Sequence, residues 1–216
     1  MDAFFLLWSN LDLSISQYIY DNSGEAFIGS YYYIQDLTSI IAVTVSITLI
    51  SIVGYCCFAK NGYLGQRRKI FVFLLTAFIL GPGIMVNLVL KDNWGRPRPR
   101  QVIEFGGEHD YRSPFDPSFV RKSGSSFVCG DASVGFSFFS LALFLRKRKW
   151  LWLSGIAGTV IGFSRIVQGA HFFSDVLFSG WVVWFCSIIL HTLFFEYKPF
   201  QQTVTSNDVR SFHATQ

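Results

Sequence analysis

The sequence predicts an all-α integral membrane protein, built as a bundle of five to six transmembrane helices. Apolar residues make up 51% of the 216 residues and aromatic residues 18%, whereas charged residues make up only 15%. A typical soluble domain carries roughly 25% charged residues. Uncharged segments close to the length that a membrane-spanning helix needs, about 20 residues, recur along the chain. This composition excludes a disordered chain and a nucleic-acid-binding tail, and it argues against a soluble enzyme.

Five segments are long and apolar enough to be predicted as membrane spans. Together they hold only two charged residues, Asp131 and Arg165. In chain order they are residues 37–59, 70–90, 123–145, 150–170 and 176–195. The run Gly81-Pro82-Gly83 predicts a kink in the second span, because proline interrupts helical hydrogen bonding.

The N-terminal segment is a weaker membrane candidate than these five. Residues 1–36 are apolar only in short stretches, which Asn10 and Asp12 interrupt. They lack the basic region and the small-residue cleavage site of a signal peptide, so we expect a helix that lies at the membrane interface. The chain is therefore predicted to be a single membrane-embedded domain, with an interfacial segment over 1–36, a helical core over 37–197 and a cytoplasmic tail over 198–216.

The distribution of lysine and arginine predicts the orientation in the membrane. Short loops that are rich in these residues stay in the cytoplasm, and the loops 60–69 and 146–149 each carry four of them. The segments 91–122 and 165–175 then face the outer side. The first of these two segments nevertheless holds five arginines. Binding an anion is the simplest reason to keep so many arginines on that side.

Three polar clusters are expected to meet at this outer surface, namely residues 91–99, 126–133 and 164–175. Arginine offers a planar fork that matches phosphate oxygens, and lysine offers a compact charge. His171 and Asp175 are four residues apart, so on a helix they share a face where the carboxylate can orient the imidazole. No zinc-ligand spacing accompanies the clusters, and the lack of a carboxylate cage argues against an obligatory magnesium ion.

The outer two clusters resemble the type 2 phosphatidic acid phosphatase (PAP2) superfamily over about residues 70–195. The pattern K-x6-R-P ends at Pro99, and the pattern S-R-x5-H-x3-D ends at Asp175. The middle cluster is similar to the Pro-Ser-Gly-His motif of that family, but only its glycine, Gly130, is retained. The positions of Pro, Ser and His are occupied by Val128, Cys129 and Asp131.

A finer resemblance is to the lipid A 4′-phosphatase-like members of this superfamily. It depends on the run Trp-Gly-Arg-Pro-Arg-Pro at 94–99, on Glu-Phe-Gly-Gly at 104–107 and on Ser-Phe-Val at 126–128. The acidic residue after Gly130 is also similar to that branch.

The resemblance implies a metal-free phosphatase without cofactors, in which His171 attacks phosphorus and forms a phosphohistidine that water hydrolyses. Asp175 would orient His171, and Asp131 would take the place of the missing histidine as the general acid. An aspartic acid in that role needs a raised pKa to hold its proton near neutral pH. The expected phosphate-binding residues are Lys91, Arg98, Arg165, Cys129, Gly130 and Ser164.

The expected function is hydrolysis of a phosphomonoester of a membrane lipid, with lipid A as the first choice of substrate. The expected location is the bacterial inner membrane, with the active site facing the periplasm. Undecaprenyl diphosphate and phosphatidylglycerophosphate remain open as substrates of the same class. A membrane protein that binds phospholipid headgroups without catalysis is the alternative from another class, because the middle motif departs from the family. The oligomeric state is not predicted.

Overall fold

The computed structural model describes residues 2–27, 32–58, 67–118 and 125–195, and these residues form helices and connecting loops without a strand. The predicted all-α fold is confirmed. The elements are α1 (Asp2–Asn22), α2 (Tyr32–Phe58), α4 (Arg68–Phe78), η1 (Ile79–Lys91), α5 (Asp92–Trp94), η2 (Pro99–Gln101), η3 (Ile103–Phe105), α6 (Gly130–Phe136), α7 (Phe138–Leu145), α8 (Arg148–Val167) and α9 (Phe173–Phe195). The predicted tail, residues 198–216, lies outside the described residues.

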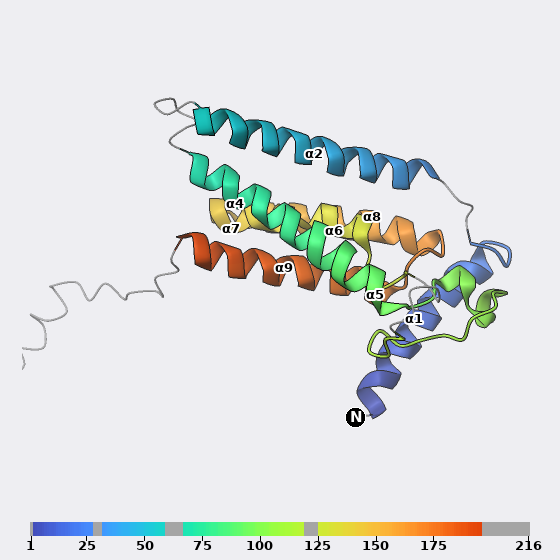
Figure 1. Ribbon diagram of the computed structural model, residues 1–216. Coiled ribbons are helices and arrows are strands. Elements are labelled where there is room, and N and C mark those ends of the chain that lie inside the picture. The colour runs from blue at the N-terminus through green and yellow to red at the C-terminus, as the bar shows by residue number, and fades with distance from the viewer. Residues whose placement is uncertain (1, 28–31, 59–66, 119–124, 196–216) are drawn as a thin grey trace, which may run out of the picture.

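Among the described residues, three helical segments are long and apolar enough to cross a membrane. They are Arg68–Gln101, Arg148–Val167 and Phe173–Phe195. They run side by side with α2, α6 and α7 in an elongated bundle (Figure 1). The predicted span 37–59 corresponds to α2, in which residues 43–55 form a shorter apolar stretch, and the predicted span 123–145 corresponds to the shorter apolar segment Gly130–Leu145. The composition and the helix lengths together identify a membrane protein.

The predicted span 123–145 is not one continuous helix. Its helical part begins only at Gly130, and Ser137 separates α6 from α7. The Ser137 hydroxyl donates a hydrogen bond to the Val134 carbonyl, and the Ser140 hydroxyl donates one to the Ser137 carbonyl. Serine side chains that bond nearby carbonyls compete with the regular backbone pattern and often bend a helix.

The second predicted span changes its helical form where Pro82 interrupts it. Proline has no N–H to donate and its ring crowds the preceding turn, and the chain continues from Ile79 to Lys91 as a wider π-helix. The Asn87 side chain donates a hydrogen bond of 2.7 Å to the Pro82 carbonyl. The expected kink is thus realised as a change of helical pitch, which carries the chain to the polar end of the bundle.

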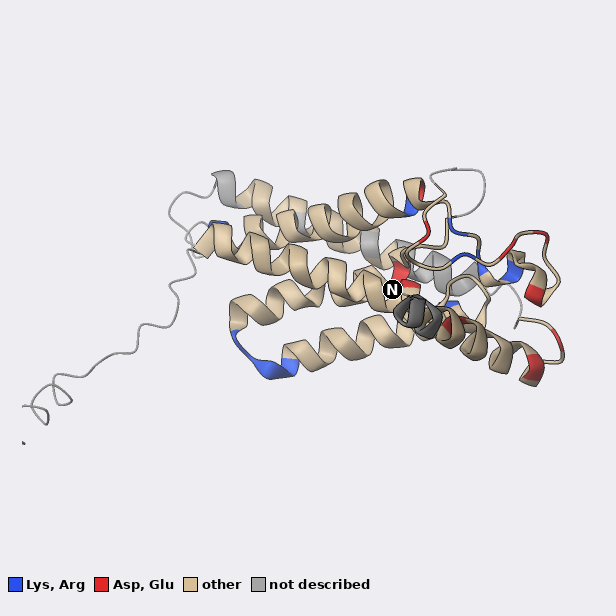
Figure 2. Ribbon diagram, turned by 90° about the horizontal axis from the view of Figure 1, so that it is seen from below, with Lys and Arg blue, Asp and Glu red and all other residues tan. Residues whose placement is uncertain are grey.

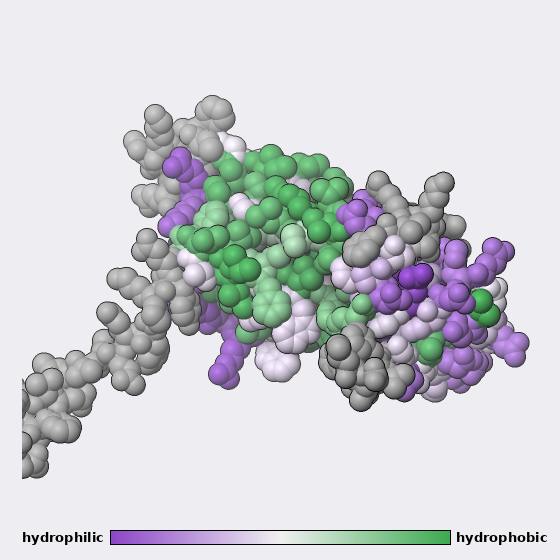
Figure 3. All heavy atoms as spheres, turned by 60° about the horizontal axis from the view of Figure 1, so that its bottom comes forward, coloured by the Kyte–Doolittle hydropathy of each residue, from purple (hydrophilic) through white to green (hydrophobic). Residues whose placement is uncertain are grey.

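The bundle has two polar ends and an apolar middle. Lysine and arginine of the loop between α7 and α8 lie at one end, and the loops of the predicted site lie at the other (Figure 2). Lys69 lies at the same end as the α7–α8 loop, with its Nζ 5.4 Å from the centre of the Phe195 ring at the end of α9. Hydrophobic side chains cover the surface between the ends (Figure 3). An apolar surface of this extent suits contact with lipid.

Helix α1 lies across the site end of the bundle, at a steep angle to the other helices (Figure 1). Its 21 residues are not among the helices that qualify as membrane spans. The core beside it is formed by η1, α6, α8 and α9, which pack around Val86, Val128, Phe136 and Val183. The N-terminal segment is therefore helical, as expected, and it contacts the part of the bundle where the site was predicted.

Helices α6 and α8 approach each other closely at a pair of glycines. A Cβ atom added to Gly135 would lie 2.6 Å from the Gly158 backbone nitrogen, which cannot move aside without shifting α8. Gly155, on the same helix as Gly158, faces open space instead. Small residues at such crossings let the two backbones pack at short range.

We predict that Gly135→Ala destabilises the fold by about 1–3 kcal/mol, because the new methyl group overpacks the crossing of α6 and α8. Thermal unfolding in detergent measures the change. Gly155→Ala is the matched control, and we expect no loss of stability from it. Equal melting temperatures for the two variants would contradict the close packing of these helices.

Candidate active site

The three polar clusters meet at one end of the bundle, as the sequence predicts. Backbone hydrogen bonds join them directly. The Ser126 N–H donates to the Arg96 carbonyl at 3.0 Å, and the Cys129 N–H donates to the Asp175 carbonyl at 3.1 Å. The Arg100 N–H donates to the Gly169 carbonyl at 3.1 Å. The chain after α5, the chain before α6 and the α8–α9 link therefore form one unit.

His171 is buried in this unit, with only 1% of its surface exposed. Its Nδ1 lies 2.7 Å from the Ser126 carbonyl oxygen and 3.7 Å from Asp175 Oδ2. A carbonyl oxygen can only accept a hydrogen bond, so this contact assigns a proton to Nδ1. In the neutral ring the lone pair is then on Nε2, which is the atom available to attack an electrophile.

Asp175 supports His171 through the chain segment that carries Ser126. Its Oδ2 accepts hydrogen bonds from the Ser126 hydroxyl at 2.5 Å and from the Phe172 N–H at 2.8 Å. Direct orientation of His171 by Asp175 was expected, and the carboxylate does lie beside the ring. The shorter contact of His171, however, is the carbonyl of Ser126. Asp175 thus fixes the residue that holds the imidazole.

Arg96, which the sequence analysis did not place in the site, holds the other oxygen of Asp175. Its guanidinium is completely buried and donates a hydrogen bond of 2.5 Å to Asp175 Oδ1. A second nitrogen donates to Asp12 of α1 at 2.7 Å, and Nε donates to the Arg112 carbonyl at 2.8 Å. The guanidinium also lies over the Phe172 ring, 4.4 Å from its centre. One buried arginine therefore bridges two buried carboxylates.

Asp12 makes α1 part of the same network. Its carboxylate accepts hydrogen bonds from the Ser174 N–H at 2.8 Å and from the Ser174 hydroxyl at 2.6 Å. The only sequence signal for this role is a charged residue that interrupts an apolar stretch. That signal was interpreted as an interfacial break. A buried carboxylate is costly unless it is paired, and Arg96 supplies the pairing.

The cationic part of the site is formed by Arg98 and Arg165. Arg165 is 5% exposed, and its Nε lies 3.0 Å from Asp131 Oδ2. Another of its nitrogens donates a hydrogen bond of 2.6 Å to Gln168. Arg98 donates to the Ser125 hydroxyl at 3.2 Å and lies within electrostatic reach of Arg165, Asp131 and Cys129. Two guanidinium groups near a single carboxylate leave a surplus of positive charge, which makes the site suited to an anion.

The remaining predicted phosphate-binding residues differ in their surroundings. Gly130 lies against the Asn87 side chain, which leaves no room for a Cβ atom. The Ser164 hydroxyl donates to the Ile161 carbonyl within α8. Lys91 ends η1 with its side chain partly exposed, and within the described residues no hydrogen bond or ion pair joins it to the cluster. The structure thus brings Arg98 and Arg165 to the cluster more clearly than Lys91 or Ser164.

Comparison with known proteins assigns the family. Residues 68–199 match the family described as the PAP2 superfamily. The chain belongs to the PAP2 superfamily. It is therefore a phosphatase that acts on phosphoric monoesters, and its apolar helices agree with a lipid phosphatase of the membrane.

The relatives of this PAP2 protein carry a more specific description. A protein named lipid A 4′-phosphatase from Francisella tularensis subsp. novicida is 35% identical over 205 residues, which cover 91% of this chain and 92% of the relative. Two proteins of the same name, from Rhizobium leguminosarum and Rhizobium etli, are each 33% identical over 131 residues. Those matches cover 58% of this chain and 56% and 51% of the relatives. No solved structure gives a significant match.

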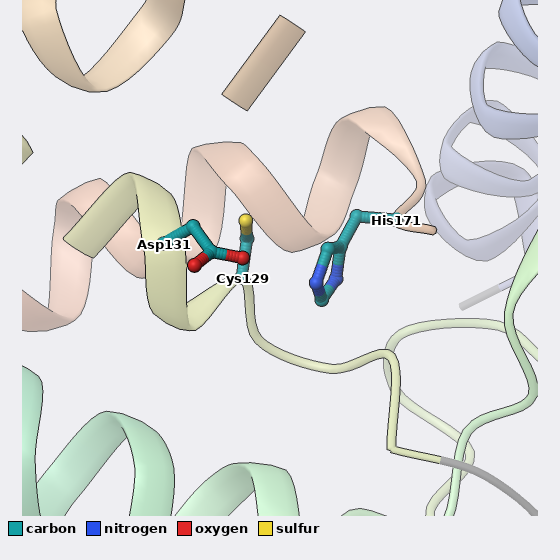
Figure 4. Close-up of side chains that lie close together, drawn as sticks. All are labelled: Cys129, Asp131 and His171. Carbon is teal, nitrogen blue, oxygen red and sulfur yellow. The ribbon is translucent and has the colours of Figure 1, made fainter. Parts of the chain in front are cut away.

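The PAP2 site also gathers three side chains that could hold a metal ion. Among the described residues, ligand atoms of Cys129, Asp131 and His171 lie within 4.8 Å of one another. Figure 4 shows Cys129 between the other two. Sulfur, carboxylate and imidazole are donors that zinc accepts. Asp131 already forms an ion pair with Arg165, so a cation would have to compete with that arginine.

The surroundings of His171 change its proton affinity. Burial alone would lower the pKa of His171, but Cys129 and Asp175 outweigh that effect and raise the pKa to about 9. An ordinary histidine titrates near 6.5. In the free PAP2 enzyme His171 therefore holds a second proton at neutral pH, and that proton must leave Nε2 before the ring can act as a nucleophile.

We predict that Asp12→Asn lowers turnover by tenfold or more while the apparent affinity for substrate stays similar, because Asp12 acts on catalysis through Arg96 and Asp175. Steady-state kinetics in detergent separate the two quantities. Arg96→Lys keeps a charge but loses the planar fork, and it should have the same signature. Asp116→Asn is the control, since Asp116 forms an exposed pair with Arg112 at 3.6 Å. A fall confined to apparent affinity would contradict the positioning role.

Proposed function

We propose that this PAP2 protein removes a phosphate from lipid A at the periplasmic surface of the bacterial inner membrane, through a metal-independent phosphohistidine on His171. The observation that carries the proposal is the Nδ1 contact of His171 with the Ser126 carbonyl. It leaves Nε2 for attack beside the guanidinium groups of Arg98 and Arg165. A covalent intermediate on histidine divides one difficult displacement into two easier steps.

In the first step Nε2 attacks phosphorus, the Nε2–P bond forms and the bond to the lipid oxygen breaks. Arg98 and Arg165 stabilise the charge on the phosphoryl oxygens. The phosphoryl group takes Arg165 from its ion pair with Asp131. Asp131 can then accept the Nε2 proton of His171 through one bridging water, because a ring nitrogen of His171 lies within 4.8 Å of the Asp131 carboxylate. One transferred proton thus produces both a neutral nucleophile and a protonated acid.

At the end of the first step Asp131 donates its proton to the leaving lipid oxygen. In the second step the Asp131 carboxylate is therefore free to act as a base. Water attacks phosphorus, Asp131 accepts the proton from water, and the Nε2–P bond breaks to release inorganic phosphate. Asp131 therefore takes the part of the histidine that the family motif carries at this position. Cys129, buried beside both groups, is a small residue that lines the phosphate pocket.

Support for lipid A as the substrate comes from the relatives, all three of which carry the name lipid A 4′-phosphatase. The match to the Francisella protein extends over 91% of this chain, so it includes regions beyond the shared PAP2 segment. Support for the orientation comes from the basic loop at the bundle end opposite the site.

We expect purified enzyme to release phosphate from lipid A in the presence of a metal chelator, with a higher kcat/KM than for undecaprenyl diphosphate or phosphatidylglycerophosphate. Phosphate release from this lipid panel measures the preference. Loss of activity with the chelator would contradict metal independence. A clear preference for another lipid would contradict the substrate assignment.

Two histidine variants from the same bundle end accompany this measurement. One removes the proposed nucleophile, and the other is its control. His171→Ala should lower turnover by roughly 10³-fold or more, as loss of a covalent nucleophile does. His109→Ala removes an exposed loop histidine and should leave the rate unchanged. With a ³²P-labelled substrate, an acid-labile and alkali-stable label should remain on the wild-type protein after rapid quenching and should be absent from His171→Ala.

The raised pKa of His171 gives a signed prediction of pH dependence. In the proposed mechanism the proton that reaches the leaving oxygen comes from His171, whose pKa is about 9, and above that pH His171 no longer carries it. We therefore expect the rate on a lipid monophosphate to fall above about pH 9. An activated aryl phosphate needs no acid and should not show the fall. Cys129→Ser removes one cause of the raised pKa, so the limb should move to lower pH; an unchanged limb would contradict the assignment.

A further inference from the structure

A cleft of about 360 Å³ opens beside the phosphate site, between the end of α1 and the loops that follow η2. It adjoins the site through two contacts. Gln168, in its wall, accepts a hydrogen bond of 2.6 Å from Arg165. Arg100, on the other side, is tied by its backbone to Gly169, two residues before His171. A substrate whose phosphate lies at His171 would therefore extend into this cleft.

The apolar part of the cleft is a cluster of three aromatic rings. The centre of the Tyr20 ring lies 5.4 Å from that of Phe27 and 5.5 Å from that of Phe105, and the Phe27 and Phe105 rings are 5.4 Å apart. Phe27 also packs against Gly169, where a Cβ atom would collide with its ring. Phe105 is 6% exposed, so it supports the wall from behind, and Tyr20 and Phe27 present the ring surface that the cleft exposes.

The polar part of the cleft is dominated by Arg100. Its side chain is exposed, and within the described residues no hydrogen bond or ion pair engages its guanidinium. The positive charges of Arg100 and Arg165 both interact electrostatically with Arg98. Like charges so close together repel each other, and a bound anion relieves that repulsion. Glu25 and Gln168 add hydrogen-bonding groups to the same lining.

We infer that this cleft binds the sugar ring that carries the phosphate, so that the enzyme recognises a phosphorylated glycolipid headgroup. The inference rests on the proposed function and deepens it. The volume is at the lower end of the range for ligand pockets, about 300–1,000 Å³, which suits one sugar ring better than acyl chains. The aromatic rings contact the apolar face of the sugar, Glu25 and Gln168 bond its hydroxyls, and Arg100 pairs with the charge of the phosphoryl group.

The position of the cleft agrees with a role in recognition. It lies at the polar end of the bundle, where a headgroup is found, and apart from the apolar surface that faces lipid. Tyr20, Glu25 and Phe27 come from the α1 region, which precedes the segment 68–199 that matches the PAP2 superfamily. The residues shared with the superfamily thus perform the chemistry, while a segment outside that match forms half of the headgroup site.

Calorimetric titration of the purified enzyme in detergent tests this inference without turnover. The two probes are N-acetylglucosamine 4-sulfate, a sulfate ester that a phosphatase does not cleave, and inorganic sulfate. We expect the sugar sulfate to bind at least tenfold more tightly than inorganic sulfate. Sugar sulfate that binds no more tightly than inorganic sulfate would overturn the inference.

Two arginine variants complete the test. Arg100→Gln should weaken the binding of both probes by tenfold or more, because Arg100 pairs with the anionic group that the two probes share. Arg112→Gln is the matched control, because Arg112 is an arginine of the same outer region that pairs with Asp116, and it should bind both probes as the wild-type protein does. Unchanged binding of both probes to Arg100→Gln would overturn the role of that residue. Lipid A hydrolysis is measured separately, so failure of the proposed substrate is distinguishable from failure of the sugar site.

Discussion

The buried ion pairs of Arg96 are the interaction on which the rest of the active site depends. A fully buried guanidinium would be very costly alone, since the loss of hydration amounts to several kcal/mol even after relaxation. Asp12 and Asp175 compensate for that loss with contacts of 2.7 and 2.5 Å. Because these partners belong to α1, to the loop after α5 and to the start of α9, their pairing fixes three distant parts of the chain at one point.

The position of His171 follows from that anchor. Asp175, held by Arg96 on one oxygen, holds Ser126 with the other. The carbonyl of Ser126 in turn sets the Nδ1 proton of His171 and leaves Nε2 for chemistry. A nucleophile must be held close to its reacting geometry, and small errors in that geometry reduce the rate strongly. The buried network explains how a histidine in a link between two membrane helices keeps one orientation.

Charge balance explains the unusual middle motif. Arg98 and Arg165 concentrate positive charge around Asp131, which lies close to His171 and offsets part of that charge in the free enzyme. The aspartate at this position is the counter-ion of Arg165, and in the proposed mechanism it also accepts a proton from His171. In that mechanism the substrate phosphate replaces the carboxylate on the arginine, so binding itself prepares the acid. A histidine at the same position could not act as the resting counter-ion.

The membrane class, the meeting of three polar clusters and the family could all be predicted from the sequence, because apolar length and motif spacing are local properties of the chain. The structure was needed for the pairing of Arg96 with Asp12, which lie 84 residues apart and form no motif. It was also needed for the contact of His171 with Ser126, since a backbone carbonyl is present at every residue and leaves no trace in the sequence. The cleft between α1 and the outer loops also depends on the tertiary structure. Its walls are far apart in the chain, and only folding brings Tyr20 and Phe27 against Phe105 and Arg100.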